Sequence, residues 1–157
     1  MKNKTKIFFL FLACLTLMGC PPHHIYDYEY TGQKSKGKEH RFEKLSLDED
    51  NDILIDCFFY YSFIGEKKKA LVAKIMTEKK SNLDLQALKV KIHSSKLGEL
   101  KHMELPDLPN WDSLPMRTFG RKVDIKNEKK IRQMLINDTL SISFSNGMKY
   151  QFVRKAE

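Results

Sequence analysis

The longest alternating stretch of the chain runs from Ile53 to Ile64 and reads ILIDCFFYYSFI. Its odd positions form an almost continuous apolar row, whereas its even positions mix Leu, Phe, Tyr and Ile with Asp and Ser. A repeat of two residues is typical of a β-strand, and a strand that is apolar on one face and mixed on the other suits the middle of a sheet. The sequence therefore predicts a central strand here.

The C-terminal stretch Thr139–Val153 (TLSISFSNGMKYQFV) predicts a β-hairpin and also its register. A two-residue Asn-Gly turn would place the apolar row of one strand beside the polar row of the other. A three-residue loop at 145–147, with Gly147 at positive φ, puts every apolar residue on one face, so burial favours this loop. The resulting pairs are Phe144 with Met148, Ile142 with Tyr150, and Leu140 with Phe152.

Other segments predict further strands with less certainty of type. Ala70–Thr77 suits a returning strand, although its Ala, Lys and Met also suit a helix; eight residues between turn signals favours the strand. Residues 83–93 alternate but change phase, which a bulge near residues 86–87 would correct. Residues 119–125 alternate again, and the proline-containing stretch 97–115 predicts a loop with a short strand near Leu100–Leu105.

Asn127–Asn137 (NEKKIRQMLIN) predicts the one convincing helix. Asn127 can cap its N-terminus, and the i, i+3, i+4 spacing of Ile131, Met134 and Leu135 forms a short apolar stripe. Because strands do not alternate with helices along the chain, a parallel sheet is disfavoured. We therefore predict a mainly β fold, an antiparallel β-sandwich with the immunoglobulin-like form as one version, and one short helix near 127–137.

The N-terminal segment has the composition of an export signal. Residues 1–6 contain three lysines and no acid, and the apolar run Ile7–Met18 follows them. A basic head followed by such a run is typical of a secretory signal, whereas a helix that spans a bilayer needs about 20 apolar residues. We therefore predict that this segment directs the chain out of the cytoplasm.

The run ends in Leu17-Met18-Gly19-Cys20, which resembles the lipobox of bacterial lipoprotein precursors. The resemblance covers residues 1–20 only. It implies cleavage between Gly19 and Cys20, acylation of the Cys20 sulfur, and usually acylation of the new amino group. Because two or three acyl chains anchor a protein durably, it also implies attachment to membrane lipid through Cys20.

Removing the signal at 1–19 leaves 138 of the 157 residues, which suits one domain. Residues 20–44 are rich in Pro, Gly, Lys and polar groups and predict a lipid-anchored tether, so that the single mainly β domain would span 45–157. Removal of the signal lysines lowers the formal net charge from +8 to about +5. This charge suits solubility, or attraction to anionic headgroups or envelope polymers. Binding to nucleic acid is disfavoured, because export separates the chain from the nucleic acid of the cytoplasm.

Cys57 is the one cysteine left in the folded part, so the mature chain cannot form an intramolecular disulfide. Its position inside the apolar run predicts a buried structural thiol. His23-His24 with Asp27 lacks the spacing of a structural metal site, and the acidic run at 48–52 lacks the Gly and distal Glu of a calcium loop. We therefore predict no metal and no cofactor.

The sequence contains no nucleophile elbow and no glycine-rich phosphate loop, and the turn-like cluster Ser94-Ser95-Lys96 does not have the Ser-x-x-Lys arrangement, so no catalytic residue is assigned. Aromatic residues give the candidate partner-binding surface, with Trp111 and Phe119 as its centre and Tyr60 and Tyr61 as further members. Trp111 lies in a proline-rich loop, where a sandwich presents binding residues, but it also suits a plug at the end of the core.

These observations favour a lipid-anchored envelope protein whose β domain binds or scaffolds a partner without catalysis. One alternative is an inhibitor or immunity-type protein that blocks a secreted effector, for which a rigid loop at 105–120 would be the inserted element. Another is an envelope enzyme whose active site no motif reveals. The anchor predicts a site on the cell membrane or the outer membrane, facing away from the cytoplasm, and Pro21 after the cysteine favours the outer membrane in a cell with two membranes.

Overall fold

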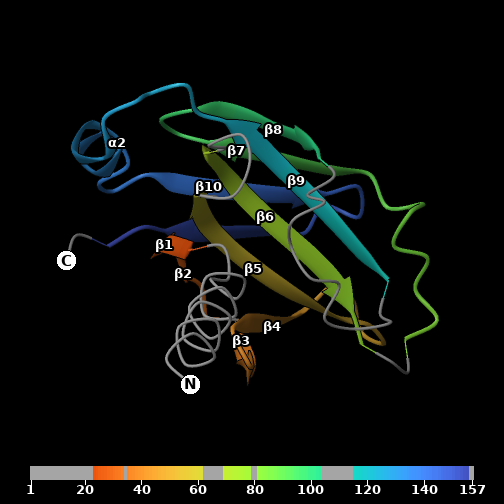
Figure 1. The fold of residues 1–157 in the computed structure, drawn as a ribbon. Coiled ribbons are helices and arrows are strands. Elements are labelled where there is room, and N and C mark those ends of the chain that lie inside the picture. Colours follow the sequence, from red (N-terminus) through yellow and green to blue (C-terminus); the bar gives the residue numbers. More distant parts are fainter. Residues whose placement is uncertain (1–22, 34, 62–68, 79–80, 104–114, 156–157) are drawn as a thin grey trace, which may run out of the picture.

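The computed structural model describes residues 23–155 apart from 34, 62–68, 79–80 and 104–114. Their elements form one antiparallel sheet and one short helix, α2 (Figure 1). The elements are β1 (His23–Asp27), β2 (Glu29–Tyr30), β3 (Ser35–Glu39), β4 (Phe42–Ser46), β5 (Asp52–Tyr61), β6 (Lys69–Thr77), β7 (Val90–Ser94), β8 (Gly98–His102), β9 (Met116–Lys122), α2 (Glu128–Met134), β10 (Thr139–Phe144) and β11 (Lys149–Val153).

The predicted two-sheet sandwich is wrong. Hydrogen bonding runs without a break along the order β2-β11-β10-β7-β8-β9-β6-β5-β4-β3, and β1 pairs with β5 beside that path. The sheet curves until it is nearly closed into a barrel, so its inner face packs on itself instead of on a second sheet. The mainly β class and the short helix agree with the sequence, whereas the architecture does not.

The segment from β1 to β2, residues 23–30, brings the barrel near to closure, and we call it the closing segment. β1 pairs with the second half of β5, as in Asp27 opposite Phe58, and the backbone N–H of Tyr28 donates to the carbonyl of Cys57 at 2.9 Å. The same chain then pairs with β11 through Tyr30 opposite Phe152. One continuous run therefore bonds first to β5 and then to β11, which joins two strands that lie far apart along the sheet order.

This closure moves the start of the folded part. The predicted tether at 20–44 contains strands β1, β2 and β3 and most of β4, and its Tyr28 is buried in the core. The sheet therefore begins at His23 rather than at residue 45. The polar composition of this stretch arises because β3 lies at the edge of the sheet, where all five of its residues are exposed.

The predicted hairpin register is confirmed. Leu140 pairs with Phe152 and Ile142 with Tyr150, and the Phe144 N–H donates to the Met148 carbonyl at 2.9 Å across the three-residue loop. Gly147 has φ +87°, the left-handed conformation that this loop requires. Burial of all the apolar residues on one face selects this register, as the alternation indicates.

The central strand and the helix are also confirmed, with small changes of bounds. β5 is described from Asp52 to Tyr61, and residues 62–64 of the predicted strand lie outside the described residues. β6 is a strand rather than a helix. The side chain of Asn127 accepts from the Lys129 N–H and the Lys130 N–H and so caps α2, whose Ile131 is fully buried. The helix ends at Met134, earlier than the pattern indicates.

The predicted bulged strand at 83–93 is wrong in its first half. Asp84 begins a turn in which the Ala87 N–H donates to its carbonyl at 3.2 Å and the Gln86 N–H donates to its carboxylate at 2.9 Å. Strand β7 starts only at Val90. The change of phase in the alternation therefore marks a turn, which places Leu85 in the core before the strand begins.

Inside the barrel, one apolar cluster extends from β5 and β6 to the C-terminal hairpin and α2. Ile53, Ile55 and Phe59 of β5 are fully buried in it, as are Leu140 and Ile142 of β10. The interior is therefore filled with side chains, which leaves the outer surface of the barrel and its two ends as the places for chemistry or binding.

Candidate functional site

The predicted site residues fall in different places. Leu17, Met18, Gly19 and Cys20 of the lipobox lie outside the described residues, as does Trp111. Phe119 is a core residue on β9, only 4% exposed, with the Arg117 guanidinium 4.9 Å from its ring centroid. Tyr60 is buried too, so neither ring forms an exposed aromatic surface.

Cys57 is a buried thiol that faces the inside of the barrel. Burial, with a smaller contribution from the negative charge of Asp56, holds the pKa of this thiol well above its usual range. A nucleophilic cysteine needs a stabilised thiolate, and this environment favours the neutral thiol. Cys57 therefore acts as a small apolar residue of the core.

Among the described residues, no group of three or more His, Cys, Asp and Glu side chains could hold a metal ion. His93 and His102 lie on exposed positions of β7 and β8, and the side chains of His23 and His24 lie outside the description. In the acidic turn, one carboxylate oxygen of Asp48 accepts from the Asp50 N–H at 3.0 Å and the Asn51 N–H at 2.7 Å. That carboxylate stabilises its own turn.

The most densely bonded ionisable group is Asp138, which is fully buried at the start of β10. Its carboxylate accepts from the Tyr28 hydroxyl at 2.9 Å, the Ser94 hydroxyl at 2.8 Å, the Ser95 hydroxyl at 2.8 Å and the Lys96 N–H at 3.0 Å. These donors come from the closing segment and from the end of β7. The Asp138 network, meaning these five residues, therefore ties the closing segment to the body of the barrel.

Electrostatics keep the Tyr28 hydroxyl of the network protonated. Burial and the adjacent charge of Asp138 both raise the pKa of the Tyr28 phenol, so this hydroxyl remains a donor. The Asp138 carbonyl also accepts from the Arg154 N–H at 3.0 Å, and the Arg154 guanidinium donates to the Arg132 carbonyl at 2.7 Å. With its lone pairs occupied by fixed donors, this carboxylate is suited to holding structure rather than to moving protons.

A second charged cluster lies on the outer face of the sheet. Asp56 of β5 stands directly opposite Lys74 of β6, and the Arg41 guanidinium contacts Asp56 at 2.6 Å and Asp27 at 3.0 Å. The guanidinium also lies 4.8 Å from the ring centroid of Phe58. Asp56 is only 5% exposed, so its carboxylate is largely withdrawn from water, whereas the Arg41 side chain is exposed.

Burial is the largest influence on the Asp56 carboxyl and raises its pKa to about 6, against the attraction of Arg41 and Lys74. The folded state therefore binds the proton more tightly than the unfolded chain, whose carboxyl has the ordinary value of 3.8. It follows that the stability contributed by this group is full below about pH 4 and is lost as the pH rises to about 6.

We expect the free energy of unfolding to fall by about 2–3 kcal/mol more in the wild type than in Asp56→Asn between about pH 4 and pH 7. Asparagine does not titrate, so the difference between the two proteins isolates this carboxyl from other groups. Urea unfolding at both pH values measures it. Equal pH dependence in the two proteins would show that the carboxyl titrates as it does in water.

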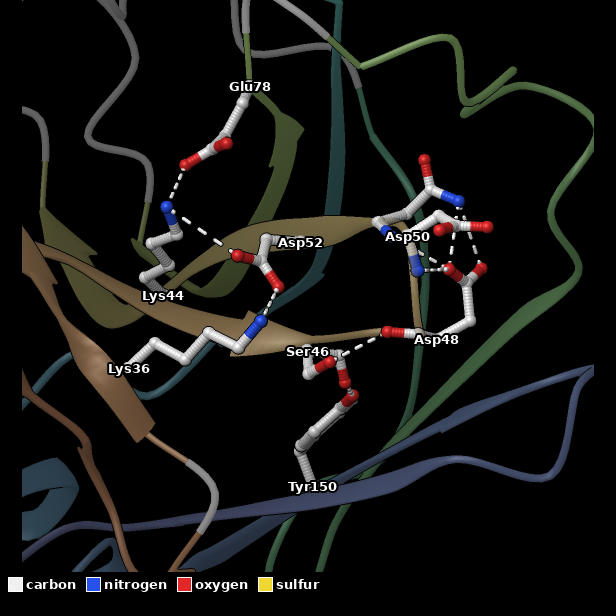
Figure 2. A network of polar contacts seen from close by, with 9 residues as sticks. Lys36, Lys44, Ser46, Asp48, Asp50, Asp52, Glu78 and Tyr150 are labelled. Carbon is white, nitrogen blue, oxygen red and sulfur yellow. Dashed lines mark hydrogen bonds and ion pairs between the residues drawn. The ribbon is translucent and has the colours of Figure 1, made fainter.

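A third set of charges lies where β4 meets β5. Figure 2 shows Lys44 between Glu78 and Asp52, with Lys36 on the other carboxylate oxygen of Asp52 at 2.7 Å. Nearby, the Tyr150 hydroxyl donates to the Ser46 carbonyl, which attaches the turn after β4 to the C-terminal hairpin. The ion pairs are partly exposed, so each contributes little stability, and their charges remain near the surface.

Charge is distributed unevenly between the two ends of the barrel. We call "acidic end" the one that carries the turn between β4 and β5, where the carboxylates are Asp48, Glu49, Asp50, Asp52, Glu78 and Asp84. We call "basic end" the opposite one, where β1 begins, β9 ends and α2 lies, on the left of Figure 1. Its exposed lysines are Lys96, Lys122, Lys126, Lys129, Lys130 and Lys155.

The family models, the curated proteins and the solved structures give no match to this sequence. Within the described ranges, no helix has the length and apolar character needed to cross a membrane.

Sequence reasoning missed the Asp138 network and the Arg41–Asp56 pair. In the sequence, Asn137-Asp138 marks the end of a helix. The one signal for the network was that the acid Asp138 stands directly before a strongly alternating strand. Asp56 had a clearer signal, because a lone acid inside an apolar strand must find a partner when it is buried. Its partner Arg41 comes from the stretch that the sequence indicated as tether.

Proposed function

We propose that this protein is a lipid-anchored envelope protein whose barrel-like domain binds or scaffolds a partner at the membrane surface without catalysing a reaction. The N-terminal basic head, the apolar run and the lipobox resemblance support the anchor at Cys20. Anchorage through acyl chains gives the domain a fixed location on the outer side of a membrane.

One observation supports the non-catalytic part of the proposal, namely that the buried carboxylates are already engaged, whereas the buried Tyr60 hydroxyl has no hydrogen-bond partner among the described residues. Asp138 accepts four hydrogen bonds from fixed donors, and Asp56 is paired with Arg41. Cys57 lies in the apolar interior. General acid, base and nucleophilic catalysis need a reactive group that can reach a substrate, whereas binding needs only a surface.

The position of the first strand supports scaffolding close to the membrane. His23, where β1 begins, is three residues after Cys20. An extended chain covers at most about 3.5 Å per residue, so the start of the sheet lies within roughly 10 Å of the anchored sulfur. A domain held so closely presents its surface to partners in or on the same membrane.

Chemical crosslinking in native membranes tests the proposal. The wild-type protein is expected to capture an envelope protein or polymer that is enriched at least about tenfold over a control in which residues 1–22 carry an unrelated domain. The control shares the anchor and so removes neighbours captured through the lipid alone. Equal capture by the two proteins would contradict a binding role for the barrel.

A further inference from the structure

The anchor and the basic end lie on the same side of the barrel. In the sheet, His23 pairs with Tyr61 and Tyr61 pairs with Lys69, and the Val123 N–H donates to the Lys69 carbonyl at 2.9 Å. These four residues form one row across neighbouring strands. Because adjacent strands are about 4.8 Å apart, the start of β1 lies roughly 15 Å from the backbone at Val123.

The segment that follows Val123 carries the charge. The ammonium of Lys69 donates to the carbonyls of Ile125 at 3.0 Å and Lys126 at 2.9 Å, which fixes the connection from β9 to α2 against the start of β6. The side chains of Lys126, Lys129 and Lys130 are exposed along this connection and the first turn of the helix. The basic residues are therefore held on a rigid part of the fold.

Acidic residues at this end are few among those described. Asp124 and Glu99 are exposed there, Glu29 is paired with Lys155, and Glu128 is the first residue of α2. Six exposed lysines thus outnumber the acids, while the carboxylates of the turn between β4 and β5 lie at the opposite end. The excess of lysines therefore lies at the end from which the anchor leaves. At the acidic end, Lys36 and Lys44 pair with Asp52 and Glu78, and Lys89 lies beside the hairpin turn.

We propose that the basic end rests on the anionic phospholipid headgroups of the membrane that holds Cys20, so that the acidic end points away from the bilayer. This proposal rests on the lipid anchor of the proposed function. Lysines within a Debye length of about 8 Å of an anionic surface are attracted to it. With a tether of three residues, the anchor keeps these lysines within reach of the headgroups.

The bilayer is favoured over a soluble anionic polymer because the anchor and the exposed lysines lie at the same end of the barrel. A polymer could bind a basic surface anywhere on the barrel, whereas headgroups can meet only the side that the short tether turns toward the membrane. The acidic end also suits this orientation, because carboxylates are repelled by anionic headgroups.

The test uses the acylated protein in vesicles of phosphatidylcholine, with or without phosphatidylglycerol, that contain a headgroup-attached quencher. A fluorophore is placed at Gln133→Cys on α2 or at Ser145→Cys in the hairpin turn near the acidic end, both exposed positions. In anionic vesicles we expect quenching at position 133 to exceed that at 145 at least threefold. The triple variant Lys126→Glu/Lys129→Glu/Lys130→Glu is expected to lose this ratio.

The matched control, Lys89→Glu/Lys91→Glu/Lys149→Glu, makes the same change of charge at exposed lysines elsewhere and is expected to keep the ratio. A triple Lys→Gln variant of the basic end should give an intermediate value. Equal quenching at both positions, or an unchanged ratio in the charge-reversed basic end, would overturn the proposal. Binding of soluble polyphosphate to the basic end, together with equal headgroup quenching at positions 133 and 145, would also overturn the proposal.

Intact mass of the same preparation separates the two proposals. If acyl chains are present and the quenching ratio is one, the orientation is wrong and the anchor stands. If acyl mass is absent, the anchor itself is wrong.

Discussion

Replacement of Asp138 by alanine is expected to lower the free energy of unfolding by about 3–5 kcal/mol. The substitution leaves the hydroxyls of Tyr28, Ser94 and Ser95 and the N–H of Lys96 without their shared acceptor in a buried site. Buried donors without a partner are more costly than the lost bonds themselves, because each was withdrawn from water on folding. The closing segment and the end of β7 would lose their common attachment.

Urea unfolding at neutral pH measures this loss. Asp124→Ala, at an exposed acid of the connection to α2, is the control and is expected to change stability by no more than about 0.5 kcal/mol. Asp138→Asn keeps the shape and one acceptor oxygen, so an intermediate loss is expected. A loss below about 1 kcal/mol for Asp138→Ala would show that the carboxylate is not the centre of the network.

Replacement of Tyr28 by alanine is expected to have a comparable effect, a loss of about 3–5 kcal/mol. Tyr28 is 6% exposed and contributes both its ring to the core and its hydroxyl to Asp138. Tyr28→Phe keeps the ring and removes only the hydrogen bond, so about 1–2 kcal/mol is expected. The two variants together separate packing from hydrogen bonding.

Tyr30→Ala provides the comparison, since this half-buried ring lies two residues along the same segment and packs against the edge of the core. Its loss is expected to be smaller than that of Tyr28→Ala. If Tyr28→Ala were as stable as the wild type in thermal and urea unfolding, residues 27–31 would be a tether, as their composition indicates, and the barrel would lack its closing strand.

The sequence predicted best where a local rule was enough. The register of the C-terminal hairpin could be predicted because a slip of one residue would have turned the side chains of Tyr150 and Phe152 toward water. Both are buried as expected. The α2 helix was predicted from the Asn127 cap and the i, i+3, i+4 spacing of Ile131, Met134 and Leu135, and the structure has the cap and buries Ile131. Each of these features is decided by residues that are close together along the chain.

Architecture could not be predicted in this way. Alternation along β5 shows that one face is apolar, but it does not show whether that face packs on a second sheet or on the far side of the same one. The difference depends on the segment around Tyr28, which bonds to β5 and β11 at once. Its surroundings are polar because β3 lies at an edge, so the composition indicated a linker.

The Asp138 network shows the same limit for the candidate sites. Tyr28 and Asp138 are 110 residues apart in the sequence, and neither belongs to a motif. The Arg41–Asp56 pair likewise joins the turn before β4 to the middle of β5. Such contacts are set by the closure of the barrel, so they become visible only when the strand order is known.

The intact mass of the protein purified from its native membrane tests the central claim most directly, because the location, the short tether and the membrane-facing basic end all depend on Cys20. The predicted mass is that of residues 20–157 plus two or three acyl chains, and Cys20→Ala should lack this species. A chain that begins at Met1 and carries no acyl mass would contradict the account.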